Sequence, residues 1–262
     1  MVNVKFDGNK EAERVASFLE ESERLLGKSL VIFQCDGRAE MSQYVRLKTE
    51  MGERLGVMVT VDCRPARPAG GSSIVDLREG IMDANEDETI DGILVQLPIL
   101  DNGSSIVDRR RDEILEMIRP SKDVDGLNPA SRFLPAAVRA VERVLEVFKI
   151  DEAQKIALVG SKGMVGKRVG ERLKFLGLPF EGFDKGDNLN NLKNYEVIIG
   201  MAGSEGLIEE SMVKSGFIGI DLGYPKGDFS PEAVKKASLI TPVPGGVGPL
   251  TVVELYENLA EA

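Results

Sequence analysis

The sequence contains no histidine among its 262 residues and only two cysteines, Cys35 and Cys63. The absence of histidine excludes a Ser–His–Asp triad, a Cys–His dyad and a histidine-ligated zinc, so any proton transfer must fall to Lys, Tyr, Asp or Glu. Both cysteines lie in apolar, strand-like stretches. We therefore expect core residues in a reducing compartment, not a disulfide framework.

Long apolar runs and basic runs are also missing. No apolar run approaches the roughly 18 residues of a membrane-spanning helix, and the first residues lack the charged-then-apolar pattern of a signal peptide. No Lys/Arg run appears, and the formal net charge is -10. We expect a cytoplasmic protein that binds a small molecule, with no membrane or nucleic-acid partner. An anionic substrate would need local cations.

Short aliphatic runs alternate with stretches of helical periodicity, and this alternation predicts an α/β protein whose parallel sheets are covered on both faces. The expected strands are 30–33, 57–61, 92–97, 155–159, a strand near 180, 196–199, 217–221 and 239–240. The expected helices are one around 15–26, then 40–55, 73–85, 104–118, 135–148, 165–176 and 252–260.

Segment 119–133 carries Pro and Gly without periodicity, so we expect an irregular crossing between two domains. The first domain is expected at 1–133. A Rossmann-type dinucleotide-binding domain is expected at 134–250, and the C-terminal helix 251–262 is expected to pack back on the first domain.

The segment Thr241–Thr251 reads TPVPGGVGPLT, with three prolines and three glycines in eleven residues. Proline restricts φ and glycine admits close backbone approach, so the segment predicts a rigid strand-to-helix connection whose bare backbone can face a flat ligand. A tight structural turn is the alternative interpretation.

A second glycine-rich segment, GSKGMVG at 160–166, stands between a predicted strand and a predicted helix. Backbone N–H groups and the helix dipole at such a turn can hold a pyrophosphate. Its spacing, G-x-x-G-x-x-G, departs from the strict dinucleotide fingerprint, and a helix N-terminal turn without a ligand is the alternative.

Polar residues cluster at three places in the first domain. Tyr44 and Lys48 share a helix face, with Ser42 just before them. Gln96 and Pro98 end a predicted strand, where α/β sheets place ligand crevices. The segment KDVDG at 122–126 supplies two carboxylates in a loop. Taken singly, these are also consistent with a solvated pair, a strand cap and a turn.

Together, the order and spacing of Tyr44-x-x-x-Lys48, GILVQLP at 92–98, KDVDG and TPVPGGVGPLT resemble the FolD family over nearly the whole chain. That family comprises the bifunctional methylenetetrahydrofolate dehydrogenases and methenyltetrahydrofolate cyclohydrolases. The resemblance implies two domains flanking a cleft, a tetrahydrofolate derivative as substrate, and hydride transfer to a nicotinamide dinucleotide. It further implies hydrolysis to 10-formyltetrahydrofolate, a role in one-carbon metabolism and purine biosynthesis, and a homodimer formed through the dinucleotide domains.

The resemblance also implies residue roles. Lys48 would be a base with a depressed pKa, Gln96 would orient it, Tyr44 would lie along the substrate rings, and Asp125 would accept hydrogen bonds from the pterin. The glycines of Thr241–Thr251 would lie where folate and nicotinamide meet. The implied substrate-binding residues are Ser42, Tyr44, Pro98, Asp125, Gly246 and Pro249. The implied cofactor-binding residues are Gly160, Ser161, Lys162, Gly163, Val165, Gly166, Asp184, Lys185 and Gly246.

The match fails at the nucleotide turn and at one further motif. Gly160-Ser161-Lys162 replaces the family's Gly-Arg-Ser, Arg168 replaces a proline, and the family's second 2'-phosphate contact, a serine, falls on Lys185 beside Asp184. Two lysines in place of one arginine could pair with a 2'-phosphate and so favour NADP, whereas an acid at that strand end prefers the ribose hydroxyls of NAD. The choice between the two dinucleotides stays open. The family's Pro-Cys-Thr-Pro-x-Gly is replaced by PAAVRA at 135–140.

Rival interpretations are a shikimate-type dehydrogenase, a monofunctional methylene-pterin dehydrogenase of folate or methanopterin type, and a non-catalytic nucleotide-binding protein. The Thr241–Thr251 loop argues against the shikimate type. A methanopterin enzyme would not explain Lys48 and Gln96 together, and these residues with Asp125 argue against loss of catalysis.

Overall fold

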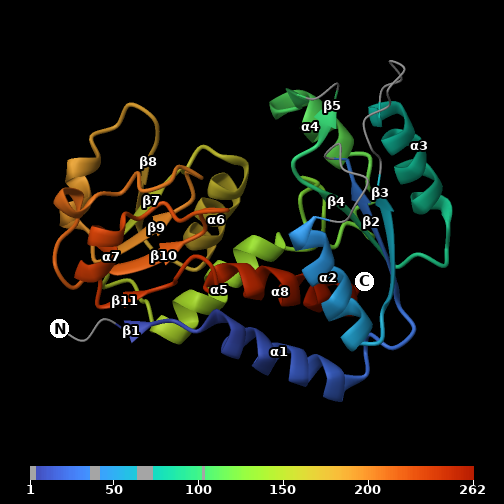
Figure 1. The fold of residues 1–262 in the computed structure, drawn as a ribbon, viewed down its shortest axis with the longest axis horizontal. Coiled ribbons are helices and arrows are strands. Elements are labelled where there is room, and N and C mark those ends of the chain that lie inside the picture. Colours follow the sequence, from blue (N-terminus) through green and yellow to red (C-terminus); the bar gives the residue numbers. More distant parts are fainter. Residues whose placement is uncertain (1–3, 36–41, 64–72, 102–103) are drawn as a thin grey trace. The chain divides into compact units, whose positions relative to one another are not determined.

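The computed structural model describes residues 4–35, 42–63, 73–101 and 104–262. They form two compact units. One comprises the described residues of 1–14 together with 137–251, and the other comprises 15–136 and 252–262. We call them the six-stranded unit and the three-stranded unit after their main sheets, both of which appear in Figure 1.

The six-stranded unit is built on one parallel sheet with strand order β1-β11-β10-β9-β7-β8. Its central strands are apolar throughout, as expected where helices cover both faces. The strands are β1 (Val4–Lys5), β7 (Ile156–Val159), β8 (Phe180–Phe183), β9 (Val197–Gly200), β10 (Ile218–Asp221) and β11 (Leu239–Ile240). The helices are α5 (Ala136–Phe148), α6 (Met164–Phe175), α7 (Pro231–Lys236) and the 3-10 turns η1 (Leu189–Asn194) and η2 (Glu210–Met212).

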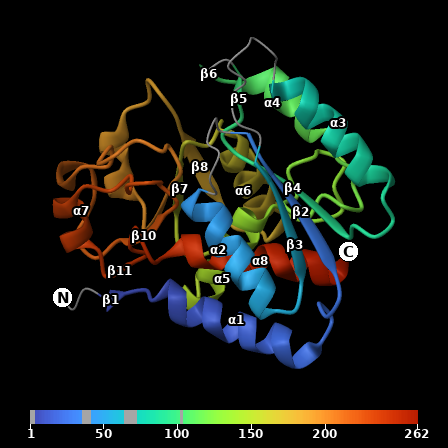
Figure 2. The ribbon, with the colours of Figure 1, turned by 45° about the vertical axis from the view of Figure 1, so that its right-hand side comes forward.

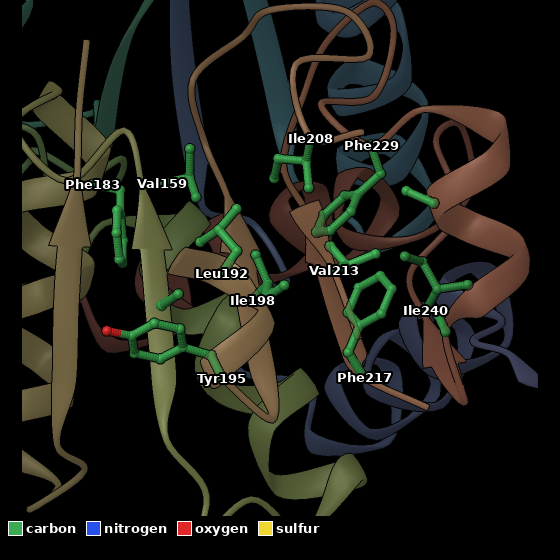
Figure 3. Packing of buried hydrophobic residues seen from close by; sticks show 13 residues of the cluster. Val159, Phe183, Leu192, Tyr195, Ile198, Ile208, Val213, Phe217, Phe229 and Ile240 are labelled. Atoms are coloured by element: carbon green, nitrogen blue, oxygen red, sulfur yellow. The ribbon is translucent and has the colours of Figure 1, made fainter. Parts of the chain in front are cut away.

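Aliphatic side chains and four aromatic rings form a core cluster of this unit, as Figure 3 shows. Phe217 stacks on Phe229 with ring centroids 5.7 Å apart, and Phe183 meets Tyr195 edge to face at 5.5 Å. Truncating a buried ring of this kind costs about 3–5 kcal/mol, so this cluster holds β8 and β10 in place.

The three-stranded unit has the parallel order β3-β2-β4, with β2 (Ser29–Gln34) between β3 (Met58–Cys63) and β4 (Gly92–Gln96), as Figure 2 shows. The segment after residue 121 extends the sheet beside β4, because Ile93 N donates to Lys122 O at 2.7 Å. The other elements are α1 (Gly8–Ser22, which starts in the six-stranded unit), α2 (Gln43–Arg54), α3 (Ser73–Glu86), α4 (Asp108–Leu115), the antiparallel pair β5 (Leu100–Asp101) and β6 (Ser104–Ser105), and α8 (Val247–Glu261).

The predicted α/β class with parallel sheets is confirmed, but three expected helices differ. The first, expected around 15–26, runs instead from Gly8 to Ser22 as α1. Helix 104–118 is wrong at both ends, because Ser104–Ser105 pairs with Leu100–Asp101 as β6 and the helix is confined to α4. The last helix begins at Val247, not 252, so Pro249 lies in its first turn, where a missing N–H is tolerated. The expected helix 40–55 is described from Gln43, and residues 40 and 41 lie outside the described residues.

The division of the chain differs from the expected boundary in its first residues. Residues 4–14 group with the six-stranded unit because β1 pairs with β11, and Phe6 N donates to Ile240 O at 2.9 Å. Residues 252–262 group with the three-stranded unit. Cys35 is buried and Cys63 half-buried, and the two form no disulfide. Each helix in the described ranges is too short or too polar to cross a bilayer.

Candidate active site and dinucleotide site

The start of α2 is tied to the carboxyl end of the central strand β2. Ser42 caps the helix, since its Oγ accepts from Val45 N at 3.3 Å. Ser42 N in turn donates to Oε1 of Gln34 at 2.7 Å, and Gln34 is fully buried at the end of β2. Ser42, predicted to bind substrate, thus has a capping role that orients the helix carrying Tyr44 and Lys48.

Lys48 and Gln96, predicted from separate motifs, are in direct contact. Lys48 is 4% exposed, and its Nζ donates to Oε1 of Gln96 at 3.0 Å. Nε2 of Gln96 donates to Leu97 O at 2.8 Å, which turns the amide oxygen toward the lysine. Tyr44 is half-buried one turn before Lys48, and Pro98 follows a cis peptide bond just beyond Gln96.

Burial lowers the pKa of Lys48, because the ammonium form loses its hydration, while the nearby charge of Asp125 raises it. Burial has the larger effect, so the amine holds its proton less tightly than an ordinary lysine. A lysine that acts as a base must release its proton more readily than usual, and burial shifts Lys48 in that direction. The side chain of Gln96 accepts a hydrogen bond from Nζ of Lys48 and, being uncharged, adds no charge beside the amine.

Tyr256 of α8 holds α2 at Lys48, a contact that the sequence did not indicate. Its hydroxyl donates to the main-chain oxygen of Lys48, and the residue is fully buried, which raises its pKa. Gly52 makes room for it, since a Cβ there would lie 2.5 Å from Oη of Tyr256 and 2.4 Å from Cγ2 of Val59. The only sequence signals were a glycine inside α2 and a tyrosine in an apolar helix.

The loop that carries Asp125 is anchored by its neighbours. Nζ of Lys122 donates to three carbonyls at the end of α3, those of Ala84, Asn85 and Asp87, at 2.9, 2.9 and 2.7 Å. Such a cation stabilises the carbonyl end of a helix dipole. Lys122 is therefore a structural residue, and its ammonium group is not directed toward a substrate.

Asp123 shapes the turn from within. It is fully buried, its Oδ2 accepts from Asn128 N at 2.8 Å, and its main-chain oxygen accepts from Oγ of Ser131 at 3.2 Å. Its other carboxylate oxygen, Oδ1, has no hydrogen-bond partner within the described parts of the chain. Burial, and to a smaller degree the charge of Asp125, raises the pKa of Asp123 to about 6.

These bonds present Asp125 as a half-buried carboxylate in a closed turn. Gly126 follows with φ of 69°, and a Cβ there would lie 2.6 Å from Pro135 N, so only glycine fits. Asp125 lies close enough to Lys48 for its charge to act on the lysine, and Lys48 in turn contacts Gln96. That the three residues share one active site stays a prediction.

In the six-stranded unit, the segment 160–166 forms a tight glycine turn between β7 and α6. Gly160 has φ of 89°, and a Cβ on Gly166 would lie 2.1 Å from Gly160 O. Gly163 caps α6 and provides no side chain for its first N–H groups, and Val165 lies in the first turn of the helix. The cradle fits a dinucleotide pyrophosphate, which can approach these backbone donors closely.

Asp184, directly after β8, accepts hydrogen bonds from this turn. Its Oδ2 accepts from Oγ of Ser161 at 2.5 Å, and its Oδ1 accepts from Lys162 N at 2.9 Å. The side chains of Lys162 and Lys185 are exposed. Three of the predicted cofactor residues are therefore brought together, and Lys185 adjoins them in sequence.

The glycines of the Thr241–Thr251 loop have reasons within their own unit. A Cβ on Gly246 would lie 2.5 Å from Pro242 O, and one on Gly8 would lie 1.8 Å from Gly246 O. Gly245 has φ of 95°, and its oxygen accepts from Gly8 N at 2.9 Å. The loop therefore requires these glycines to fold. That Gly246 and Pro249 contact substrate or cofactor stays a prediction.

Two family models match the chain. Residues 6–125 match the catalytic domain of tetrahydrofolate dehydrogenase/cyclohydrolase, and residues 135–262 match its NAD(P)-binding domain. The bifunctional protein FolD of Mycoplasmopsis synoviae is 32% identical over 257 residues, covering 88% of each chain.

Solved structures agree. The FolD methylenetetrahydrofolate dehydrogenase/cyclohydrolase of Campylobacter jejuni has a TM-score of 0.84 at 29% identity, covering 97% of this chain and 96% of that one. The Trypanosoma brucei enzyme, solved with NADP and an inhibitor, has a TM-score of 0.85 at 26% identity, covering 98% and 95%. These likenesses decide against the shikimate-type and methanopterin-linked alternatives. The chain, matched in both of its parts, belongs to the tetrahydrofolate dehydrogenase/cyclohydrolase family, that of the bifunctional FolD enzymes.

Proposed function

We propose that Lys48 is the catalytic base of this enzyme, which oxidises 5,10-methylenetetrahydrofolate with NAD(P) and hydrolyses the 5,10-methenyl product to 10-formyltetrahydrofolate. Family membership makes the chain an NAD(P)-dependent dehydrogenase and cyclohydrolase. The observation that carries the residue assignment is the contact between the buried Nζ of Lys48 and Oε1 of Gln96.

The dehydrogenase step requires little acid or base chemistry from the protein. A bound nicotinamide would supply the hydride acceptor for the methylene carbon, and the folate product would be a cation shared over two nitrogens. A lysine whose pKa is lowered by burial avoids placing a second full positive charge beside that cation. Asp125 offers a carboxylate to the N–H groups at the pterin edge, and Tyr44 offers a flat ring.

In the cyclohydrolase step, water adds to the methenyl carbon. Lys48, in its uncharged form, takes one proton from that water as the carbon–oxygen bond forms. The carbon–N5 bond then breaks as the remaining hydroxyl proton leaves the oxygen, which becomes the formyl C=O, and N5 receives a proton in its place. The formyl group remains on N10. Gln96 holds Nζ of Lys48 in one direction through the 3.0 Å hydrogen bond, so the lone pair of the amine can face the water.

The dinucleotide is assigned to the glycine turn. Backbone N–H groups in the first turn of α6, among them that of Val165, would hold the pyrophosphate, and Gly160 and Gly166 keep the approach open. Lys162, Asp184 and Lys185 would contact the adenosine ribose, and Ser161 would support Asp184 through its hydrogen bond to that carboxylate.

We further propose a cytoplasmic homodimer that supplies formyl groups for purine biosynthesis. Two cysteines that form no disulfide fit a reducing compartment, and 10-formyltetrahydrofolate is chemically a formyl donor. The homodimer follows from the resemblance to the family and is testable by light scattering.

The test combines two spectrophotometric assays. Reduced nucleotide should appear when methylenetetrahydrofolate is supplied with NAD or NADP, and added methenyltetrahydrofolate should be consumed. Lys48→Met should abolish the second reaction while some hydride transfer remains, whereas Lys28→Met, a partly exposed lysine of the same unit paired with Asp91, should retain both. No reduced nucleotide with either dinucleotide would contradict the function, and cyclohydrolase activity in Lys48→Met would exclude Lys48 as the base.

A further inference from the structure

The carboxylate of Asp184 occupies a defined place at the edge of the dinucleotide cradle. It follows the second strand of the unit β7-α6-β8, and both of its oxygens accept hydrogen bonds from the glycine turn, one from Oγ of Ser161 and one from Lys162 N. The turn and the strand end are also joined through their main chains, because Gly160 N donates to Phe183 O at 2.7 Å.

Neighbouring residues hold Asp184 in that position. Its own N–H donates to Oδ2 of Asp187 at 2.8 Å, which closes a turn after the strand. Gly182 leaves space for Ser161, since a Cβ there would lie 2.5 Å from Oγ of the serine. The hydroxyl of Ser161 is thereby engaged by a carboxylate and is directed toward it, not toward a phosphate.

This position has a known chemistry in dinucleotide folds. An acid at the end of the second strand of such a unit accepts hydrogen bonds from the free hydroxyls of the adenosine ribose. A carboxylate offers about four lone-pair sites, so Asp184 can bind the ribose in addition to its two partners in the turn. A 2'-phosphate instead brings about two negative charges next to the carboxylate.

Lys162 and Lys185 act against this preference, because their positive charges favour binding of a 2'-phosphate. Both are exposed. Each can approach a phosphate, but a lysine is a point charge on a flexible stem and lacks the fork of an arginine. The lysines therefore allow NADP to bind without removing its repulsion from Asp184.

We propose that Asp184 is a specificity-determining residue which makes NAD the preferred dinucleotide of this enzyme, with NADP as the weaker one. The proposal rests on the proposed function in that it concerns the hydride acceptor of the same reaction. It names the adenosine ribose diol as the group that Asp184 recognises.

Binding of NADH and NADPH, followed by nucleotide fluorescence without any folate, tests the proposal. The wild-type enzyme should bind NADH more tightly than NADPH. Asp184→Asn retains an oxygen for Lys162 N but removes the charge, and should shift the ratio of the two dissociation constants toward NADPH at least tenfold. The kcat/KM ratio for NAD and NADP should shift in the same direction.

Two further variants separate charge from loop shape. Ser161→Ala leaves the carboxylate in place and should keep the preference for NADH. Glu171→Gln removes one negative charge from an exposed pair with Arg168 on α6 and should change nothing. A wild-type preference for NADPH, an unchanged ratio in Asp184→Asn, or an equal shift in Ser161→Ala would each overturn the proposal. If the enzyme bound the nucleotides but did not oxidise the folate, the proposed function would fail, while the dissociation constants would still test the role of Asp184.

Discussion

Replacing Tyr256 by phenylalanine removes one buried oxygen and should loosen the attachment of α2 at Lys48. The two residues lie 208 positions apart in sequence, and Tyr256 is fully buried. Because the phenylalanine ring fills nearly the same space, the loss is mainly that of one hydrogen bond to a buried carbonyl. The free energy of unfolding should fall by about 1–2 kcal/mol.

The measurement is urea unfolding of Tyr256→Phe together with its cyclohydrolase kinetics. Since Lys48 is the proposed base, kcat should fall several-fold while KM changes less. Tyr224→Phe is the matched control, because Tyr224 is 55% exposed and its loss should change stability by no more than about 0.5 kcal/mol. If Tyr256→Phe is as stable and as active as this control, the hydroxyl does not hold Lys48.

A double-mutant cycle with Gly52→Ala examines the same contact from the other side. The added Cβ would lie 2.5 Å from Oη of Tyr256, so the single substitution overpacks the site at a cost of about 1–3 kcal/mol. In the Tyr256→Phe background that oxygen is absent, and the cost should be smaller by at least about 0.5 kcal/mol. Strictly additive effects would show that the hydroxyl does not lie against Gly52.

Two other predictions concern Asp123 and the glycine turn at 160–166. Burial raises the pKa of Asp123 from 3.8 to about 6, so the ionised form destabilises the fold above that pH and the cost disappears as the pH falls toward 4. Asp123→Asn should therefore be more stable than the wild type at pH 7, by up to about 3 kcal/mol in urea unfolding; a difference independent of pH would refute the assignment. Gly166→Ala places a Cβ 2.1 Å from Gly160 O and should abolish NADH binding, whereas Gly163→Ala, at 3.2 Å, should weaken it less. If the two variants bound NADH equally well in fluorescence titration, the glycine turn would be able to move to accommodate the added Cβ.

Patterns local in sequence were sufficient for most of the fold. Buried parallel strands need continuous apolar runs, and such runs at 30–33, 92–97 and 155–159 correspond to β2, β4 and β7. The helical spacing of Tyr44 and Lys48 likewise placed them on one helix, α2. Strands of two residues, such as β1 and β6, are too short to show a period, which is why the first residues and 104–118 were assigned differently.

Some features of the candidate site could be predicted from the sequence and others could not. Lys48, Gln96 and Asp125 could be named from motifs and a family resemblance, because each motif is contiguous. Tyr256 and the burial of Asp123 could not, since both depend on which distant segments pack together.

By itself, the sequence determined an α/β protein without histidine chemistry, and its motifs predicted a folate and a dinucleotide as ligands and Lys48 as the central lysine. The tertiary structure alone decided what each residue faces. It set Tyr256 against the carbonyl of Lys48 and turned Asp184 onto Ser161, and it gave Gly245 and Gly246 a structural reason within their own unit. The physical reason is that hydrogen bonds and desolvation act over a few ångströms in space, whereas sequence patterns report only neighbours along the chain.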